Sequence, residues 1–292
     1  MEIIVCIDDN DVPDSRGTGS LASELRELAE ERFGAQSGFI TRHQLFLHPD
    51  IAYTSHNSSM AFPAVIPEDM LTPVFEAFVE HLAKEAAPGS DPGLCVVDKQ
   101  ALRRGERLIE FGYRAKRQVL TQADAYETAE DCGVMLRACG GDGSGVIGAL
   151  AGAGLRLCGN DGEIKGGLKK YAEDSLVPVS ELLAHKRIDS VVTPDGVPAD
   201  SAGTVYVPWK VKPLLVQGRS VLIVTEEDGP GHYRAYTKEE MRRFGDVRAS
   251  VEACELFVPD AAEERLSDDF TCFNCAWRRW EADSFSCMKG KR

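Results

Sequence analysis

The sequence predicts an α/β (α+β) fold, and three observations support this class. A short apolar run rich in β-branched residues, Glu2–Ile7, predicts a buried strand. After a polar loop, apolar residues recur at helical spacing from Leu21 to Phe33. A composition of 43% hydrophobic and 27% charged residues is typical of a globular protein with a buried core, which excludes disorder as the dominant state. The 292 residues favour one large domain or two ordinary ones.

Strands and helices are expected to alternate through the first half of the chain. The strand candidates are the apolar runs Phe39–Leu47, Met60–Ile66 and Leu94–Val97. Apolar residues at helical spacing mark the helix candidates Pro67–Ala86, Lys99–Val119 and a segment within Thr121–Cys139. Ser20 is the expected N-cap of the first helix. The residues Ala129–Cys139 are expected to remain helical up to a glycine-rich stretch.

After Gly166 the pattern changes to short strands. They are expected at Ser190–Val192, Thr204–Val211, Pro213–Val216 and Ser220–Val224. Thr237 is the expected cap of a helix through Phe244, with Glu239 and Glu240 in its first turn. A polar linker, Asp260–Asp269, then leads to a closing segment with three cysteines and two tryptophans.

The charge balance narrows the classes of partner. Asp and Glu number 47 against 33 Lys and Arg, which gives a formal net charge of −14. This argues against a general electrostatic nucleic-acid binder, because such proteins need a basic face. It suits a protein that binds a polyphosphate through metal ions held by acidic side chains.

The apolar runs and the cysteines indicate in which part of the cell the protein is expected. No run approaches the roughly eighteen apolar residues of a membrane span, so no membrane partner is expected. The nine cysteines are odd in number and scattered, and the chain opens without a signal-peptide pattern. These features predict a cytoplasmic protein with mostly reduced thiols.

An acidic cluster follows the first predicted strand. Asp8, Asp9 and Asp11 lie within four residues at a strand end, where open α/β sheets place ligands. Three carboxylates repel one another unless a cation neutralises them, and Mg²⁺ prefers carboxylate and phosphate oxygens. A metal–nucleotide site is one interpretation. A polar turn that caps the next helix is the other, because Asp and Asn are common in turns.

The glycine-rich stretch has two interpretations of its own. Gly143, Gly145 and Gly148 form a G-x-G-x-x-G pattern, but a dinucleotide fingerprint needs a preceding strand, and a helix is expected there. More generally, the backbone amides could approach phosphate, with the helix Val146–Ala153 pointing its positive end at it. The alternative is a flexible loop followed by a tightly packed helix.

Four separated segments within residues 1–160 share motifs with one known family. They are Ile7–Asp11 with Gly17 and Thr18, then Leu47–Tyr53, Asp91–Leu94 and Gly143–Ala151. In this order they resemble the Asp-Asp-Thr-Asp, Leu-Asn-Pro-x-Ile-Pro-Tyr, Asn-Pro-Gly and Gly-Arg-Gly-x-Ile-Gly-Ala-Leu-Ala segments of the archaeal agmatinylcytidine synthetases. Those enzymes modify a minor isoleucine tRNA.

The resemblance implies a fold and a reaction. The fold would be a kinase-like domain without a P-loop over residues 1–165, followed by a ferredoxin-like domain over 166–260 or interleaved with it near 60–130. A Cys/Trp-containing tail would occupy residues 261–292. In the family, ATP phosphorylates the C2 carbonyl of a cytidine, and agmatine then displaces the phosphate.

The resemblance also implies roles for individual residues. Asp8, Asp9 and Asp11 would hold Mg²⁺, and Thr18 matches a loop threonine associated with phosphorylation. Candidates for the remaining contacts are Gly17, Gly143, Ser144, Gly145 and Gly148 for the nucleotide, and His56, Asn57 and Ser58 for the substrate.

Several positions depart from the family pattern. Asn10 replaces a threonine, Thr54–Ser58 lacks a Lys and an Arg, and Ser144 replaces an Arg. The loss of the Lys and of the two Arg residues removes positive charge from places where phosphate or RNA could bind. The residues after Asp260 are also too few for the family's tRNA-binding OB-fold. A nucleotide is therefore the favoured partner, and tRNA is a less favoured one.

The closing segment is the basic, aromatic part of the chain. Cys272, Cys275 and Cys287 offer three thiolates, whereas a structural zinc needs four ligands, and Cys254 is the candidate fourth. Such a composition could also stack bases. The alternative is a terminal helix whose tryptophans dock on the core.

These patterns lead to one main expectation and two alternatives. The main one is an Mg²⁺- and ATP-dependent enzyme, kinase-like or ligase-like, that activates a carbonyl or hydroxyl of a nucleoside or small molecule. The alternatives are a non-catalytic, nucleotide-binding regulatory module with the same fold, and an RNA-binding protein that acts through its tail. The sequence predicts no oligomeric state.

Overall fold

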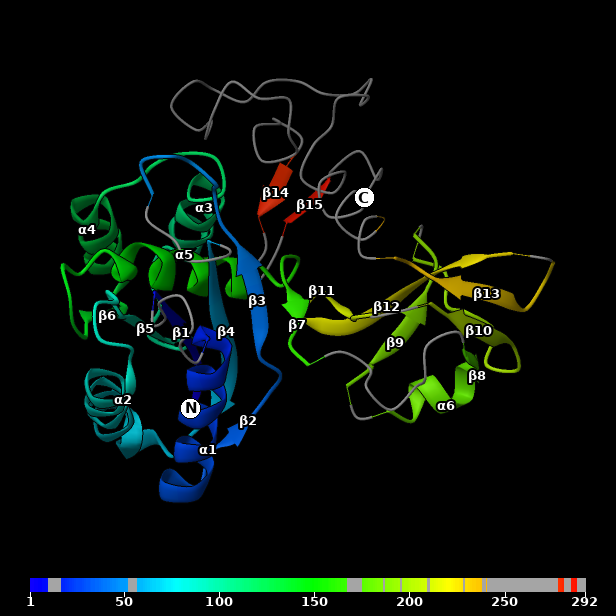
Figure 1. The fold of residues 1–292 in the computed structure, drawn as a ribbon, viewed down its shortest axis with the longest axis horizontal. Helices are drawn as coiled ribbons and strands as arrows, with labels where there is room; N and C mark the ends of the chain where they lie inside the picture. Colours follow the sequence, from blue (N-terminus) through cyan, green and yellow to red (C-terminus); the bar gives the residue numbers. More distant parts are fainter. Residues whose placement is uncertain are drawn as a thin grey trace. The chain divides into compact units, whose positions relative to one another are not determined.

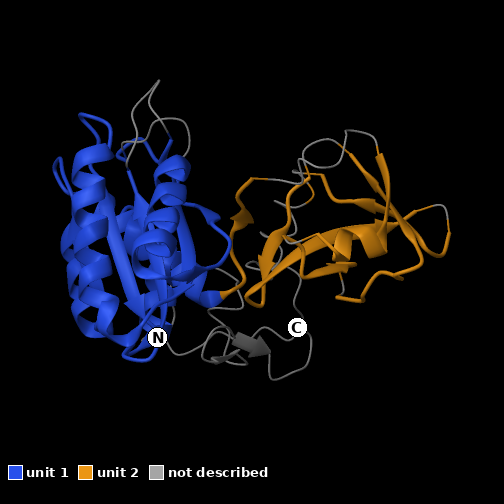
Figure 2. Ribbon diagram, turned by 90° about the horizontal axis from the view of Figure 1, so that it is seen from below, with its two compact units in different colours: residues 1–158 blue, residues 159–292 orange. Residues whose placement is uncertain are grey.

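The computed structural model shows the mixed α/β fold that the sequence predicts, in two compact units of residues 1–158 and 159–292 (Figure 2). It describes residues 1–9, 17–51, 57–166, 175–185, 187–194, 196–208, 211–227, 229–237, 240, 278–280 and 285–287. Among these residues no helix combines the length and the apolar character that a membrane span requires. The assignment of kinase-like and ferredoxin-like domains stays a prediction.

Unit 1, residues 1–158, is built on an antiparallel sheet with its first strand in the middle. The strand order is β6-β5-β1-β4-β3, and the short β2 also pairs with β4. The strands are β1 (Glu2–Asp8), β2 (Gln36–Ser37), β3 (Thr41–Gln44), β4 (Ser58–Val65), β5 (Gly93–Asp98) and β6 (Met135–Ala138). In this register Cys6 of β1 lies opposite Ala61 of β4 and Cys95 of β5.

Helices cover both faces of this sheet (Figure 1). Their bounds are α1 (Thr18–Phe33), α2 (Leu71–Glu85) after the 3₁₀ turn η1 (Glu68–Met70), α3 (Gly105–Arg114), α4 (Gln122–Cys132) and α5 (Gly145–Cys158). Successive strand residues point to opposite faces. Ile3, Val5 and Ile7 therefore join the core with α1 and α2, whereas Cys6 lies on the face that α5 covers.

Helix α5 is the central helix of its layer, and nearly all of it is buried. It packs between the sheet and α3, and glycines let the backbones approach closely. A Cβ at Gly154 would lie 2.0 Å from the carbonyl oxygen of Leu108, and one at Gly112 would lie 2.7 Å from that of Ala151. Arg156 is the one charged residue of the helix, and burial lowers its pKa to about 10.

Two local expectations for unit 1 are wrong. Residues 135–138 form β6, although the stretch up to Cys139 was expected to be helical. Gly133 takes a left-handed conformation with φ of 71° and ends α4, so the chain leaves the helix and pairs with β5. The first helix begins at Thr18 with Gly17 as its N-cap, three residues before the expected cap Ser20.

Unit 2, residues 159–292, contains short strands, as expected after Gly166. Its order is β7-β11-β12-β13-β10-β8, with β9 parallel to β12 and β10 parallel to β13. The elements are β7 (Glu163–Ile164), β8 (Ser175–Pro178), α6 (Val179–Leu183), β9 (Ser190–Val192), β10 (Thr204–Val207), β11 (Leu214–Val216), β12 (Arg219–Glu226) and β13 (His232–Ala235). A separate antiparallel pair joins β14 (Arg278–Trp280) and β15 (Phe285–Cys287).

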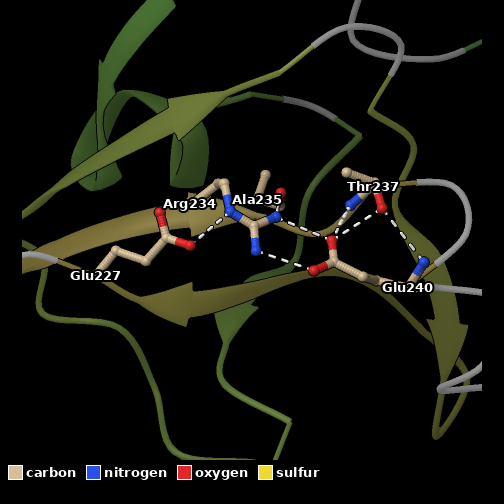
Figure 3. A network of polar contacts seen from close by, with 5 residues as sticks. All are labelled: Glu227, Arg234, Ala235, Thr237 and Glu240. Atoms are coloured by element: carbon tan, nitrogen blue, oxygen red, sulfur yellow. Dashed lines mark hydrogen bonds and ion pairs between the residues drawn. The ribbon is translucent and has the colours of Figure 1, made fainter.

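An ion-pair network follows β13 (Figure 3). Arg234 donates from Nε to Glu227 over 2.7 Å and from both Nη atoms to Glu240 over 2.9 Å. Glu240 also accepts from the backbone and hydroxyl of Thr237, and its own amide donates to that hydroxyl at 3.3 Å. This is the cap expected at Thr237, and residues 241–244 of the expected helix lie outside the described residues.

We predict that the network makes the stability of unit 2 depend on acid pH. The bonds from Arg234, joined by those from Thr237, lower the pKa of Glu240 to about 2. A depressed folded pKa gives a stabilising contribution that is present above the unfolded pKa of about 4.3 and is lost as the pH falls toward 2. Urea unfolding of wild type and Glu240→Gln should show a stability difference that shrinks over this window. A difference that grows on acidification contradicts the assignment, and Glu68→Gln at an exposed site is the control.

We also predict that Gly154→Ala destabilises unit 1. The new methyl would overlap the carbonyl of Leu108, and such overpacking costs about 1–3 kcal/mol. Gly105→Ala is the matched control, because its nearest neighbour is the end of the Leu102 side chain at 3.2 Å. Chemical unfolding of both variants checks this, and equal effects would contradict the close contact of α3 and α5.

Candidate functional site

A pocket of about 250 Å³ in unit 1 gathers most of the candidate residues of the sequence analysis. They come from the end of β1, the start of α1, the start of β4 and the turn into α5. The members are Asp8, Asp9, Thr18, Asn57, Ser58, Ser144, Gly145 and Gly148. Segments far apart in the sequence therefore meet where β1 ends.

A backbone turn brings two adjacent carboxylates to the same pocket. Side chains of consecutive residues in a strand point to opposite faces, so Asp8 and Asp9 would be separated if the strand continued. Asp9 instead has φ of 53°, a left-handed conformation that Asp tolerates better than most residues. Both residues line the pocket as a result.

Asp8 is enclosed on most sides and opens to the pocket. It is 9% exposed and lies opposite Gly93 of β5. The first turn of α5 lies over it, because a Cβ added at Gly148 would come within 1.6 Å of its Oδ2. The carboxylate thus sits at the N-terminal end of a helix, where the helix dipole favours negative charge.

The glycine-rich loop before α5 is held by Asp91, which the sequence analysis did not assign. The Asp91 carboxylate accepts the Asp142 amide at 2.5 Å, and its carbonyl accepts the Gly145 amide at 3.0 Å. Gly141, with φ of 60°, packs directly against this carboxylate. The Asp-Pro-Gly motif was the available signal, but nothing in the sequence joined it to the glycine-rich stretch.

The backbone amides at the start of α5 donate within the chain. Ser144 donates to the Asp142 carboxylate at 2.8 Å, and Val146 and Ile147 donate to the carbonyls of Gly143 and Ser144 at 3.3 and 3.1 Å. The bond from the Ser144 amide also lowers the pKa of Asp142. Nucleotide binding by these glycines and Ser144 stays a prediction, and the described contacts favour the tightly packed helix.

The dinucleotide interpretation is not supported, although a strand does precede the loop. β6 and β5 are antiparallel, whereas a dinucleotide fold places the glycine pattern in a parallel βαβ unit. Gly145 serves packing instead. A Cβ there would lie 2.1 Å from the Asp91 carbonyl oxygen and 2.7 Å from the Gly93 nitrogen.

The pocket is strongly acidic. Asp50 and Asp142 join Asp8 and Asp9 in lining it, and among its described residues there is no Lys, Arg or His. Apolar side chains complete the wall, with Leu45 and Ile51 on one segment and Leu120 on another. None of these residues was expected to line a site, although Asp50 and Ile51 belong to the motif segment Leu47–Tyr53.

The remaining candidate residues from the sequence lie at different places, and some of them lie outside the described residues. The side-chain amide of Asn57 donates to the Phe46 carbonyl at 2.7 Å, so it ties two loops together beside the pocket. Gly17 caps α1, and Gly143 has φ of 86° in the loop before α5. The other candidate residues, Asp11, His56, Cys254, Cys272 and Cys275, lie outside the described residues, and of Cys287 only its place in β15 is described.

Metal binding has limited support within the described part of the chain. There, no group of three or more His, Cys, Asp or Glu side chains is close enough to hold a metal ion. The proposed set of three carboxylates includes Asp11, which is outside that part. The Mg²⁺ and Zn²⁺ assignments therefore stay predictions.

The chain is similar to several solved structures. A tRNA fluorescent labeling enzyme is 25% identical, with a TM-score of 0.46, over 53% of this chain and 36% of that one. Apo TiaS, an agmatidine synthetase for an isoleucine tRNA, is 24% identical, with a TM-score of 0.45, over 53% of this chain and 35% of that one. A TiaS complex with that tRNA and ATP is 20% identical, with a TM-score of 0.47, over 68% of this chain and 49% of that one.

TiaS structures are thus among the solved structures to which this chain is similar. The chain covers about a third to a half of the length of these proteins. No family model matches the chain, and no curated protein matches it.

The buried thiols of Cys6 in β1 and Cys95 in β5 should be inert. Burial, and to a smaller degree the neighbouring Cys95 and Asp8, raise the pKa of Cys6. Burial likewise raises the pKa of Cys95. We predict that iodoacetamide at about pH 8 leaves both unmodified in the native protein, because only thiolates react. Mass spectrometry of peptides checks this, with guanidinium-unfolded protein as the control. Rapid native labelling of Cys6 would show that α5 does not seal this face.

Proposed function

We propose that unit 1 binds ATP with Mg²⁺ in the acidic pocket and transfers a phosphoryl group to a nucleoside or small-molecule acceptor. The observation that carries the proposal is the meeting of Asp8, Asp9 and Thr18 with the turn into α5 in one pocket. The chemistry needs little more than positioning and neutralised charge. The motif resemblance to agmatinylcytidine synthetases supports the same reaction class.

The lining residues suit a nucleotide that arrives with its metal. A triphosphate would be repelled by four carboxylates, and no basic side chain among the described lining residues offsets them. Mg²⁺ is typically held by one or two carboxylates together with phosphate oxygens and water. Asp8 and Asp9 provide two such carboxylates, and Asp11 is the proposed third. The bound Mg²⁺ would neutralise the charge of the triphosphate.

The two sides of the pocket suit different parts of a nucleotide. Asp8, Asp9 and Thr18 form a polar side, and Thr18 is a buried hydroxyl with 6% exposure at the start of α1. Leu45, Ile51 and Leu120 offer an apolar wall, which suits the flat face of a base. We therefore assign the phosphates to the β1–α1 side and the base to the apolar wall.

The acceptor is proposed to be a nucleoside, with a tRNA as its most specific form. TiaS has been solved in complex with an isoleucine tRNA and ATP, and the four motifs of this chain resemble segments of that family. The net charge of −14 and the missing basic residues near Thr54–Ser58 and Ser144 disfavour a large RNA surface. A free nucleoside or an RNA held mainly at the reacting base fits these charges better.

A non-catalytic nucleotide-binding module is the second candidate. Its specific support is that Ser144 stands where the family has an Arg, and that no described Lys or Arg lines the pocket. Phosphoryl transfer gains much from a cationic side chain beside the transferred group. A chain without one could keep affinity for Mg²⁺·ATP and lose turnover.

We predict that Asp8→Asn weakens the binding of Mg²⁺·ATP by about tenfold or more, because a direct metal ligand loses its charge. Isothermal titration with a non-hydrolysable ATP analogue measures this. Asp69→Asn makes the same change of net charge at an exposed position outside the pocket and should bind as wild type does. Equal affinities for wild type and Asp8→Asn would refute the site.

Turnover separates the two candidate functions. Wild-type protein with ATP, Mg²⁺ and cytidine or an RNA should release phosphate or ADP faster than Asp8→Asn does. Binding without any turnover, across nucleoside and RNA acceptors, would instead favour the regulatory module.

A further inference from the structure

Three glycines on two elements lie close to Asp8. Gly93 lies opposite Asp8 on β5, and Gly145 and Gly148 belong to the first turn of α5. A Cβ at Gly93 would come within 2.2 Å of the Gly145 carbonyl carbon, and one at Gly145 would come within 3.1 Å of the Asp8 carbonyl oxygen. The first turn of α5 thus packs directly on the backbone of the strand ends.

Gly148 is the glycine that faces the carboxylate itself. A Cβ at this position would lie 1.6 Å from Asp8 Oδ2, 2.5 Å from its Cγ and 3.0 Å from its Cβ. The first two distances are far inside van der Waals contact, so any side chain at 148 must displace the carboxylate. The space beside the Gly148 Cα is therefore the space that the carboxylate occupies.

The next glycine along the same face of α5 contacts different groups. A Cβ at Gly152 would lie 2.1 Å from Ser59 Oγ and 2.6 Å from Cys6 Sγ. Gly148 and Gly152 therefore both allow α5 to pack closely on the sheet. Only Gly148, of the two, meets a carboxylate that lines the pocket.

We infer that Gly148 is a positioning residue for Asp8. It leaves room for the carboxylate against the first turn of α5 and so fixes the direction in which Asp8 faces the pocket. Asp8 Oδ2 fills the space where a side chain at 148 would lie, and nucleotide binding by the Gly148 backbone stays a separate prediction. The consequence for Mg²⁺ rests on the proposed function, whereas the steric relation of the two residues does not.

The first test measures metal dependence. In Gly148→Ala, the Mg²⁺ concentration for half-maximal binding of a fluorescent ATP analogue should rise about tenfold or more, as for other groups that orient a metal ligand. Gly152→Ala is the matched control: it also adds a methyl between α5 and the sheet, and its Mg²⁺ dependence should stay within about twofold of wild type. Equal changes in both variants would reduce Gly148 to a packing residue and overturn the inference.

The second test uses stability and needs no nucleotide. Gly148→Ala should lower the Tm by roughly 5 °C in the wild-type background. In an Asp8→Ala background only the Asp8 Cβ remains, at 3.0 Å, so the same substitution should lower the Tm much less. An undiminished loss of Tm in that background would overturn the inference.

The two tests distinguish a failure of the steric relation between Gly148 and Asp8 from a failure of the proposed function. Should Gly148→Ala not fold alone, recovery of folding in the Asp8→Ala double variant supports the steric relation, and failure of the double variant contradicts it. Absence of Mg²⁺·ATP binding in wild type would remove the proposed function, and the Tm comparison would still decide whether Gly148 positions Asp8.

Discussion

The contact between the first turn of α5 and the ends of β1 and β5 is the constraint on which the rest of unit 1 depends. At Gly93 and Gly145 the two backbones approach so closely that no side chain fits between them. The Asp91 carbonyl accepts the Gly145 amide at this point, and the Asp91 carboxylate holds the loop before it. Because these bonds fix where the helix begins, they also fix the floor of the pocket. The polar residues of β1, α1 and β4 then converge on it.

The electrostatics of the pocket follow from this packing. Asp8 is nearly enclosed, yet it lies at the positive end of a helix, which compensates part of the cost of burying its charge. Asp9, Asp50 and Asp142 add negative charge around it. A pocket of this kind selects cationic groups or anions that carry metal ions. Part of the negative net charge of the chain is thus concentrated at this pocket. The net charge therefore does not act only as a general repulsion of polyanions.

The sequence predicted the elements whose signals are local. β1 follows from a continuous apolar run rich in β-branched residues, α1 and α2 follow from apolar residues at helical spacing, and the Thr237 cap follows from Glu240 three residues later. β6 was missed because its pairing with β5 is a tertiary contact that a helical pattern cannot reveal. Asp91 and Asp50 belong to the motifs Asp91–Leu94 and Leu47–Tyr53, but their roles were missed because each gains its position only when distant loops meet. The glycine pattern was recognised, but the reason for it, close packing of a helix on strand ends, needs the strands to be in place.

The central position of β1 has a consequence for folding during synthesis. β1 leaves the ribosome before its strand partners β4 and β5, which begin at residues 58 and 93, and before α5, which ends at residue 158. A nascent chain shorter than this carries apolar strand surface with nothing to cover it, a state prone to aggregation and to chaperone binding. High sequence separation between contacting elements also slows folding. The arrangement that builds the pocket thus delays its formation until the whole of unit 1 has been made.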